Sequence, residues 1–148
     1  SALINFFGMS WPRQVATYDL GSRLVDIAGI PGHENNHIAM YDHQYGMLLT
    51  GDTLYPGRLF INNFSEYKAS IDFLVNYSAD KELCAILGTH IELSTTPGDD
   101  YEFGVDHHPN ERALELDRAT LLELQAAITA MGNTAVRETH DNFIIFPI

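Results

Sequence analysis

The chain has 148 residues, a length typical of one domain, and 45% hydrophobic residues, a composition that excludes intrinsic disorder. Its formal net charge of −12 disfavours nucleic acid and anionic membrane surfaces as partners. No apolar run reaches the ~18 residues of a membrane helix, and the single Cys84 excludes an internal disulfide and a thiolate zinc cage. We expect a cytoplasmic protein. Because the chain begins with Ser1 rather than Met, we expect its natural N-terminus, with any targeting signal, to lie upstream.

Short β-rich runs separated by Gly and Pro fill the first two-thirds of the chain. Residues 24–30 are expected to form a strand that ends at a Pro-Gly pair. Residues 38–42 and 47–50 are two apolar runs separated by residues 43–46, which predicts a hairpin with a four-residue loop. Residues 83–88 are apolar at nearly every position, so this strand is predicted to be covered on both faces.

Two amphipathic helices are predicted. The first covers about residues 65–77, with Asn63 or Ser65 as its N-cap. The second covers residues 120–131, beginning with a capping box and ending at Gly132.

Three further segments complete the chain. Residues 111–116 are compatible with a short helix, and residues 135–139 and 143–146 with a terminal hairpin. Residues 1–148 are therefore predicted to form a single α+β domain with a mixed sheet and helices on one face.

Three potential metal ligands each follow the C-terminal end of an apolar strand: His33, Asp52 and His90. The 38–50 hairpin would return Asp52 close to His33 and place His43 at its far tip, about 15 Å away. Imidazole and carboxylate ligands suit zinc, iron or manganese. Taken singly, a His after Pro-Gly or an Asp after Gly is also a common turn residue. The metal hypothesis therefore depends on all three residues lying at strand ends together.

The segments 31–33, 50–58 and 87–92 together resemble the metallo-β-lactamase superfamily, in particular the C-terminal half of its hydrolases. The likeness covers roughly residues 15–95 and extends to the chain's end around residues 143–147. It implies one half of an αβ/βα sandwich with a metal site along one edge.

The resemblance also implies ligand roles and an activity. The family's third-motif His falls on His33, its bridging Asp on Asp52 and its last ligand His on His90. In the family a hydroxide bound to the metal attacks an ester, thioester, lactam or phosphoester, so a small-molecule substrate is implied.

The family's His-x-His-x-Asp-His motif is absent from this sequence, and this departure limits the hypothesis. Without it, His33 and His90 would belong to different metal ions with at most two protein ligands each, whereas stable zinc sites have three or four. The sequence is therefore predicted to be the C-terminal half of a hydrolase, inactive alone, with its other half removed or never present. The alternative is a non-catalytic half-domain that forms a homodimer or binds a partner chain.

Other polar residues near the predicted site are weaker candidates. His37 could contact substrate, act as an auxiliary ligand or be a solvated strand-end residue. Tyr55 and Arg58, expected in the loop after Asp52, could meet a substrate anion, or Arg58 could brace the loop.

Residues further from the motifs complete the candidates. Glu92 and Ser94 could orient His90. The adjacent pair at 107–108 is predicted to be a surface feature of a loop, and the aromatic residues at 6, 7 and 11 to be core or to cover a missing half.

Overall fold

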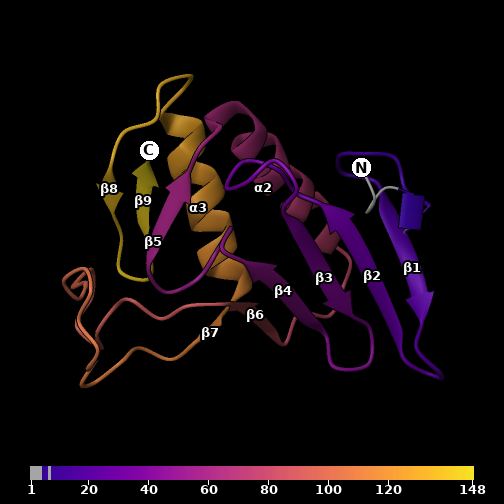
Figure 1. Cartoon of the computed structure of the whole chain (residues 1–148), viewed down its shortest axis with the longest axis horizontal. Helices are drawn as coiled ribbons and strands as arrows, with labels where there is room; N and C mark the ends of the chain where they lie inside the picture. Colours follow the sequence, from indigo (N-terminus) through magenta and orange to yellow (C-terminus); the bar gives the residue numbers. More distant parts are fainter. Residues whose placement is uncertain (1–4, 7) are drawn as a thin grey trace.

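The computed structural model describes residues 5, 6 and 8–148, which form two β-sheets and two long helices (Figure 1). The larger sheet has six strands in the order β1-β2-β3-β4-β6-β7. Its strands are β1 (Val15–Asp19), β2 (Leu24–Gly29), β3 (Ile38–Asp42), β4 (Met47–Gly51), β6 (Ala85–Gly88) and β7 (Glu115–Leu116). Neighbours pair antiparallel except β4 and β6, which are parallel. The sheet is therefore mixed, as predicted.

The second sheet has three strands in the order β5-β9-β8: β5 (Arg58–Ile61), β9 (Ile144–Pro147) and β8 (Glu138–Thr139). β9 pairs parallel with β5 and antiparallel with β8, so the predicted terminal hairpin is present, although its first strand has only two residues. The prediction that Arg58 lies in a loop is wrong, because Arg58 begins β5. This four-residue strand is too short for an alternating pattern and depends on its distant partner β9.

The two predicted helices are present as α2 (Phe64–Ser78) and α3 (Arg118–Ala130). Asn63 caps α2, since its side chain accepts a hydrogen bond from the Glu66 N–H. α3 begins two residues earlier than predicted, because Asp117 rather than Thr120 is its N-cap. The chain leaves α3 at Gly132, which has a φ of +66°.

Two other expectations are corrected. The segment 111–116 is not a helix; Glu115 and Leu116 instead form β7 against β6. The strand expected over 83–88 begins at Ala85, and only Ile86 within it is buried. Its uniformly apolar sequence therefore does not reflect burial on both faces within this chain.

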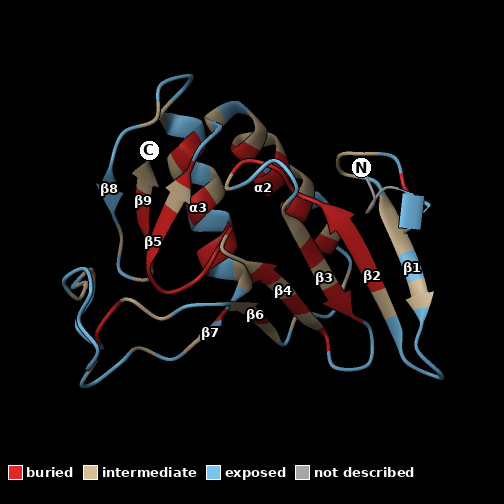
Figure 2. Cartoon of the chain, viewed as in Figure 1, coloured by how far each residue is buried: buried red, intermediate tan, exposed pale blue. Residues whose placement is uncertain are grey.

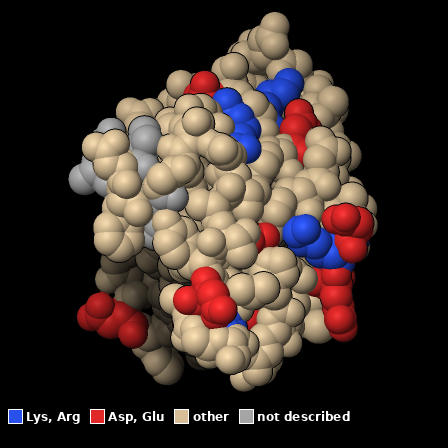
Figure 3. All heavy atoms as spheres, turned by 90° about the vertical axis from the view of Figure 1, so that its right-hand side faces the viewer, with Lys and Arg blue, Asp and Glu red and all other residues tan. Residues whose placement is uncertain are grey.

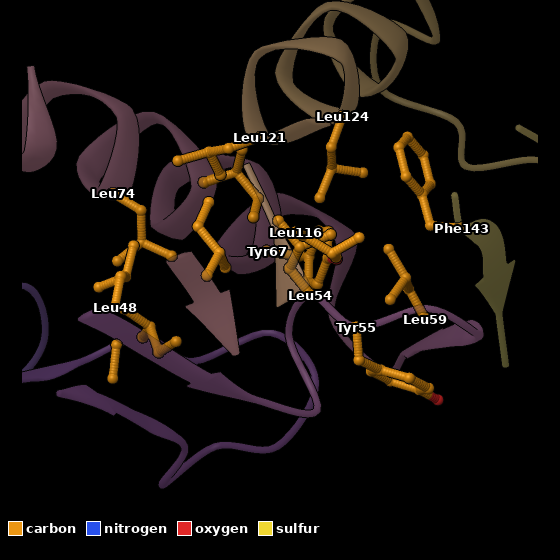
Figure 4. Close-up of a cluster of buried hydrophobic side chains, with 14 of the residues drawn as sticks. Leu48, Leu54, Tyr55, Leu59, Tyr67, Leu74, Leu116, Leu121, Leu124 and Phe143 are labelled. Carbon is orange, nitrogen blue, oxygen red and sulfur yellow. The ribbon is translucent and has the colours of Figure 1, made fainter. Parts of the chain in front are cut away.

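The core lies between the larger sheet and the two helices, with the second sheet closing one end (Figures 1 and 2). From the sheet come Tyr41, Leu48 and Ile86, which are buried. Figure 4 shows leucines of α2 and α3 converging on this layer, together with Phe143, the residue before β9. Burying each of these large side chains stabilises the fold by about 2 kcal/mol, which fixes the strand ends in place.

The opposite face of the larger sheet carries a second apolar layer. Met40, Leu49 and Leu87 are cross-strand neighbours on β3, β4 and β6, and all three are half-buried. They alternate along their strands with core residues such as Leu48, so they point away from α2 and α3. We call these three residues and their immediate surroundings the open face.

The beginning of the described chain lies beside β2. A Cβ atom on Gly29 would lie 2.4 Å from the Trp11 ring, so this glycine allows Trp11 to pack onto the sheet. Phe6 is exposed, and Phe7 lies outside the described residues.

Charged side chains are scattered over the edge of the molecule that Figure 3 shows, where Lys and Arg form no continuous patch. No helix in the part of the chain that the structure describes has the length and apolar character needed to cross a membrane.

Candidate functional site

Three strand ends bring His33, Asp52 and His90 together at one edge of the larger sheet. The Nε2 atom of His33 lies 3.3 Å from Oδ2 of Asp52, and the Nε2 atom of His90 lies 3.1 Å from Oδ1. The Asp52 side chain is 29% exposed and that of His90 is 55% exposed. One carboxylate thus lies between two imidazoles, each on a different oxygen.

His33 is oriented by the second sheet. Its Nδ1 lies 2.8 Å from the carbonyl oxygen of Phe60 in β5 and donates to it. The amide of Asn62 in turn donates to the His33 carbonyl oxygen at 2.6 Å. Because Nδ1 donates to Phe60, Nε2 is the ring nitrogen that faces Asp52, and a histidine held in this way can bind a metal through Nε2.

Asp52 is held by backbone geometry and by Thr89. Gly51 has a φ of +55°, which turns the chain sharply at the end of β4. The Thr89 hydroxyl, from the loop after β6, donates to Oδ1 of Asp52. The carboxylate therefore has a fixed orientation before any further ligand is added.

His37 lies directly beneath this turn. Its Nε2 is 3.2 Å from the Asp52 backbone nitrogen and 3.1 Å from the Thr50 carbonyl oxygen. Burial lowers the pKa of His37, although the Thr50 carbonyl and the Asp52 carboxylate act in the opposite direction. One nitrogen cannot serve both groups at once: with a proton, Nε2 donates to the Thr50 carbonyl, and without one it accepts the Asp52 N–H. In either tautomer His37 contacts the loop after β4 that carries Asp52, which we call the ligand loop.

Tyr55 packs against His90, and the two ring centroids are 5.3 Å apart in an edge-to-face arrangement. Tyr55 is almost fully buried, and its hydroxyl donates to the carbonyl oxygen of Arg58. Burial, together with the carboxylates of Glu92 and Asp52, raises the pKa of Tyr55 well above its usual value. Tyr55 therefore remains a hydrogen-bond donor whose hydroxyl is already engaged inside the protein.

Arg58 is also buried, so the geometry favours the bracing alternative over a substrate contact. Its guanidinium lies 3.3 Å from a Glu92 oxygen and 3.0 Å from an Asp100 oxygen, and donates to the Tyr101 carbonyl. The exposed Phe103 ring stacks over the guanidinium at 3.9 Å. Arg58 thereby ties β5 to the loop that follows His90.

The two residues expected to orient His90 have other partners. Glu92 accepts hydrogen bonds from the Arg58 backbone N–H and from Tyr55, so within the described chain it reaches His90 through the tyrosine. The Ser94 hydroxyl donates to Asp99. Glu92 can therefore orient His90 only indirectly, through the Tyr55 ring, and the Ser94 hydroxyl is held by Asp99 instead.

The remaining histidines discussed above lie away from the site. His43 is at the hairpin tip, 2.9 Å from a carboxylate oxygen of Asp26. His107 is exposed, and His108 stacks on Tyr101 with ring centroids 4.3 Å apart. The adjacent pair thus belongs to the surface loop, as predicted.

A cleft of about 380 Å³ opens beside His33 and Asp52. One part of its wall is polar and includes His33, His37 and Asp52, while another part is the open face, with Met40, Leu49 and Leu87. The cleft therefore places an apolar surface next to the imidazoles of His33 and His37 and the carboxylate of Asp52.

Residues 7–129 match the family model of the metallo-β-lactamase superfamily. The chain belongs to this superfamily. No match was found among curated proteins.

Solved structures of low sequence identity share the fold. A metallo-β-lactamase from Pontibacter korlensis aligns with 86% of this chain and 54% of its own, at 10% identity and a TM-score of 0.51. A double mutant of the sec-alkyl sulfatase PisA1 aligns with 84% of this chain and 18% of its own, at 10% identity and a TM-score of 0.57. The chain thus spans about half the length of the first protein and less than a fifth of the second.

Members of this superfamily typically bind metal ions, and the donor atoms here fit part of such a site. The Nε2 atoms of His33 and His90 face different oxygens of Asp52, so these three side chains would be the ones to contribute to such a site. Among the described residues, however, no three His, Cys, Asp or Glu side chains form a group that could hold a metal ion. The described residues therefore do not form a metal-binding group by themselves.

The supports of the site were largely absent from the sequence analysis. The Phe60 carbonyl that orients His33 lies on a strand that was not predicted, and backbone groups leave no sequence signal. The hydroxyl of Thr89 could have been noticed, because it directly precedes His90.

Proposed function

We propose that this chain supplies one side of the metal centre of a hydrolase, with His33, Asp52 and His90 as ligands. The supporting observation is the Asp52 carboxylate between the Nε2 atoms of two histidines. Imidazole nitrogen and carboxylate oxygen suit zinc, with iron or manganese as further candidates.

The residues of the chain have distinct roles in this proposal. A divalent cation, when bound, lowers the pKa of a coordinated water to about 7 and supplies a nucleophile at neutral pH. Asp52 bridges the ligand set, Phe60 fixes the His33 tautomer, and Thr89 orients the carboxylate. A small ester, thioester, lactam or phosphoester would lie in the cleft against the open face.

Of the three substrate candidates, only His37 lines the cleft, although its Nε2 contacts the Thr50 carbonyl and the Asp52 N–H. Tyr55 and Arg58 do not line it, and the Tyr55 hydroxyl and the Arg58 guanidinium have buried partners. We therefore retain a substrate contact only for His37 and assign Tyr55 and Arg58 to support of the site.

In this proposal each ion has only two protein ligands from this chain. We therefore expect the isolated chain to bind metal weakly and to have no activity. Three or four protein ligands are usual for zinc, and the missing ones would come from a His-x-His-x-Asp-His segment encoded upstream or carried by another chain. A sub-micromolar, one-to-one zinc site on the isolated chain, measured by calorimetry, would contradict this part of the proposal.

The ligand assignment is tested by titrating zinc into the chain while recording the ring resonances of each histidine. The resonances of His33 and His90 are expected to shift together, and those of His43 to stay unchanged. An Asp52→Asn variant should lose the shared response, while the matched Asp26→Asn variant should keep it. Equal shifts at His43 would mean non-specific binding and would overturn the assignment.

The hydrolase assignment is tested on the polypeptide that includes the coding sequence upstream of Ser1. We expect hydrolysis that a chelator abolishes, and His33→Ala or His90→Ala variants at least about 100-fold slower. His43→Ala is the control and should keep wild-type turnover. An upstream sequence without the histidine motif, together with no turnover, would favour the second candidate.

The second candidate is a non-catalytic half-domain that pairs with a second copy of itself through the open face. The uncovered row Met40, Leu49 and Leu87 favours it, because stacking two such faces removes apolar surface from water. Sedimentation should give about 33 kDa, twice the mass of one chain, and Leu49→Glu should reduce it to 16.6 kDa.

Leu122→Glu is the matched control for this experiment, because Leu122 is an exposed leucine on α3, away from the open face. That variant should retain the mass of the wild type. A wild-type chain that sediments at 16.6 kDa at micromolar concentration would end the second candidate.

A further inference from the structure

Tyr55 occupies a slot at the edge of the core, between the ligand loop and the end of β6. Figure 4 shows it at the margin of the buried cluster, with its hydroxyl pointing away from the neighbouring leucines. The ring packs edge-to-face against His90, whose imidazole is otherwise half exposed. Tyr55 is therefore a buried group in direct contact with a proposed ligand.

Two glycines make this slot possible. A Cβ atom on Gly57 would lie 2.3 Å from the Tyr55 ring, and a Cβ atom on Gly88 would lie 2.3 Å from Tyr55 Cβ. Any side chain at either position would displace the tyrosine, since real Cβ atoms do not approach so closely. Glycine at positions 57 and 88 therefore leaves the space that the Tyr55 side chain occupies.

The hydroxyl is fixed as firmly as the ring. It donates to the Arg58 carbonyl oxygen and lies 3.3 Å from Oε2 of Glu92. Glu92 is itself held by the Arg58 guanidinium and by the Arg58 backbone N–H at 2.7 Å. The tyrosine therefore cannot swing within its slot without breaking a buried polar network.

We propose that Tyr55 is a positioning residue: its clamped ring holds the His90 imidazole in the orientation that directs Nε2 at Asp52. This inference rests on the proposed function for its purpose, but the orientation itself is a property of the chain without metal. The two parts can therefore be tested separately.

The first measurement is metal-free and uses three-bond NMR couplings that report the χ1 rotamer of His90. The wild-type chain should show one rotamer. Tyr55→Leu, which removes the ring, should give averaged couplings, and Tyr55→Phe, which retains the ring, should restore most of the wild-type pattern. Wild-type couplings for His90 in both variants would overturn the proposal.

The second measurement follows cobalt(II) by paramagnetic broadening of the His33 and His90 resonances. Tyr55→Leu should raise the half-saturating concentration at His90 about tenfold, the usual effect of losing a residue that orients a ligand. His33 is an internal reference, because its Nδ1 is held by Phe60. If the wild-type chain shows no broadening at either histidine, the metal proposal fails while the coupling measurement still decides the role of Tyr55.

Tyr41 offers a matched control at the other end of the sheet. It is a buried tyrosine whose ring lies edge-on to His43 at 5.0 Å, and its hydroxyl donates to the Glu82 carbonyl at 2.7 Å. Tyr41→Leu should destabilise the fold to a similar degree and leave the His90 couplings unchanged. Averaged His90 couplings in this variant would show a general loss of packing and would count against a specific role for Tyr55.

Discussion

At each end of the larger sheet an aspartate side chain is paired with histidine, but the two aspartates differ in burial and in the space beside them. At one end, Asp52 follows β4 beside a cleft of about 380 Å³, and its side chain is 29% exposed. At the other end, Asp26 lies within β2 facing the core, and its side chain is 9% exposed. The cavity that Asp26 lines is about 10 Å³, too small for a ligand.

The two carboxylates also differ in their hydrogen-bond partners. Asp26 receives hydroxyl hydrogen bonds from Thr17 and Tyr77, and His43 completes its set. These donors come from β1, α2 and the hairpin tip, so the carboxylate joins three elements. Asp52 instead faces two imidazoles that have room for a further group. The same residue types therefore form a structural clamp or a candidate ligand set, depending on burial and adjoining space.

The largest effect that distinguishes the two ends is expected from Asp26→Asn. An amide cannot accept from all three donors, so buried polar groups are left without partners and the free energy of unfolding should fall by about 2–3 kcal/mol. Asp52→Asn is the matched variant and should change it by less than about 1 kcal/mol, because its pairs are partly exposed. Urea unfolding followed by circular dichroism measures both. Equal losses would remove the distinction between clamp and ligand set.

The sequence predicted that His33, Asp52 and His90 meet at one sheet edge, but it did not predict the groups that hold them there. The ends of three apolar strands were recognisable from their Gly-rich terminations, and the four-residue hairpin loop required Asp52 to return near His33. The Asp26 clamp could not be predicted in this way, because an aspartate within an apolar strand gives no indication that Tyr77, 51 residues away, will donate to it. Likewise β5 and β7 are strands only because of distant partners.

Burial was predicted poorly for one specific reason. The run 83–88 is apolar at nearly every position, but only Ile86 is buried. Leu87 lies on the open face beside Leu49, and no helix in the described part of this chain covers that face. Hydrophobicity indicates that a residue is to be covered and does not say whether the same chain covers it.

An intermediate effect is expected from Gly51→Ala at the ligand end. Alanine at a φ of +55° costs about 1 kcal/mol, and its Cβ would lie 2.6 Å from Nε2 of His37. We therefore expect a loss of about 2 kcal/mol in the free energy of unfolding. Gly132→Ala is the control for backbone strain alone, because its φ is +66° and the added methyl group would have no neighbouring atom within 4 Å.

Both glycine variants lose stability through backbone strain, but only Gly51→Ala also meets His37. The difference between their losses in the free energy of unfolding therefore measures how tightly His37 packs against the Asp52 turn. Adding His37→Ala to Gly51→Ala should recover the steric part of the loss, and denaturant midpoints measure each variant. A double variant no more stable than Gly51→Ala alone would mean that His37 does not limit the turn.

The smallest effect concerns acid stability at the clamp end. Burial by itself would raise the pKa of Asp26, but hydrogen bonds from Thr17, Tyr77 and His43 outweigh burial and hold the pKa below its usual value. The ionised carboxylate is therefore favoured by the folded state. Its contribution is fully present above the unfolded pKa of about 4 and is lost as the pH falls through the lower folded value.

Between these two pKa values the wild-type chain should lose up to about 1.4 kcal/mol of stability per pH unit through Asp26, and Asp26→Asn should lack this component. Asp117→Asn is a positive control, because hydrogen bonds from Thr120 lower the pKa of that helix cap in the same way. Urea unfolding at several pH values below 5 gives the slopes. A slope unchanged by Asp26→Asn would show that the hydroxyl donors stabilise protonated and ionised Asp26 equally, and the clamp would then depend on shape rather than on charge.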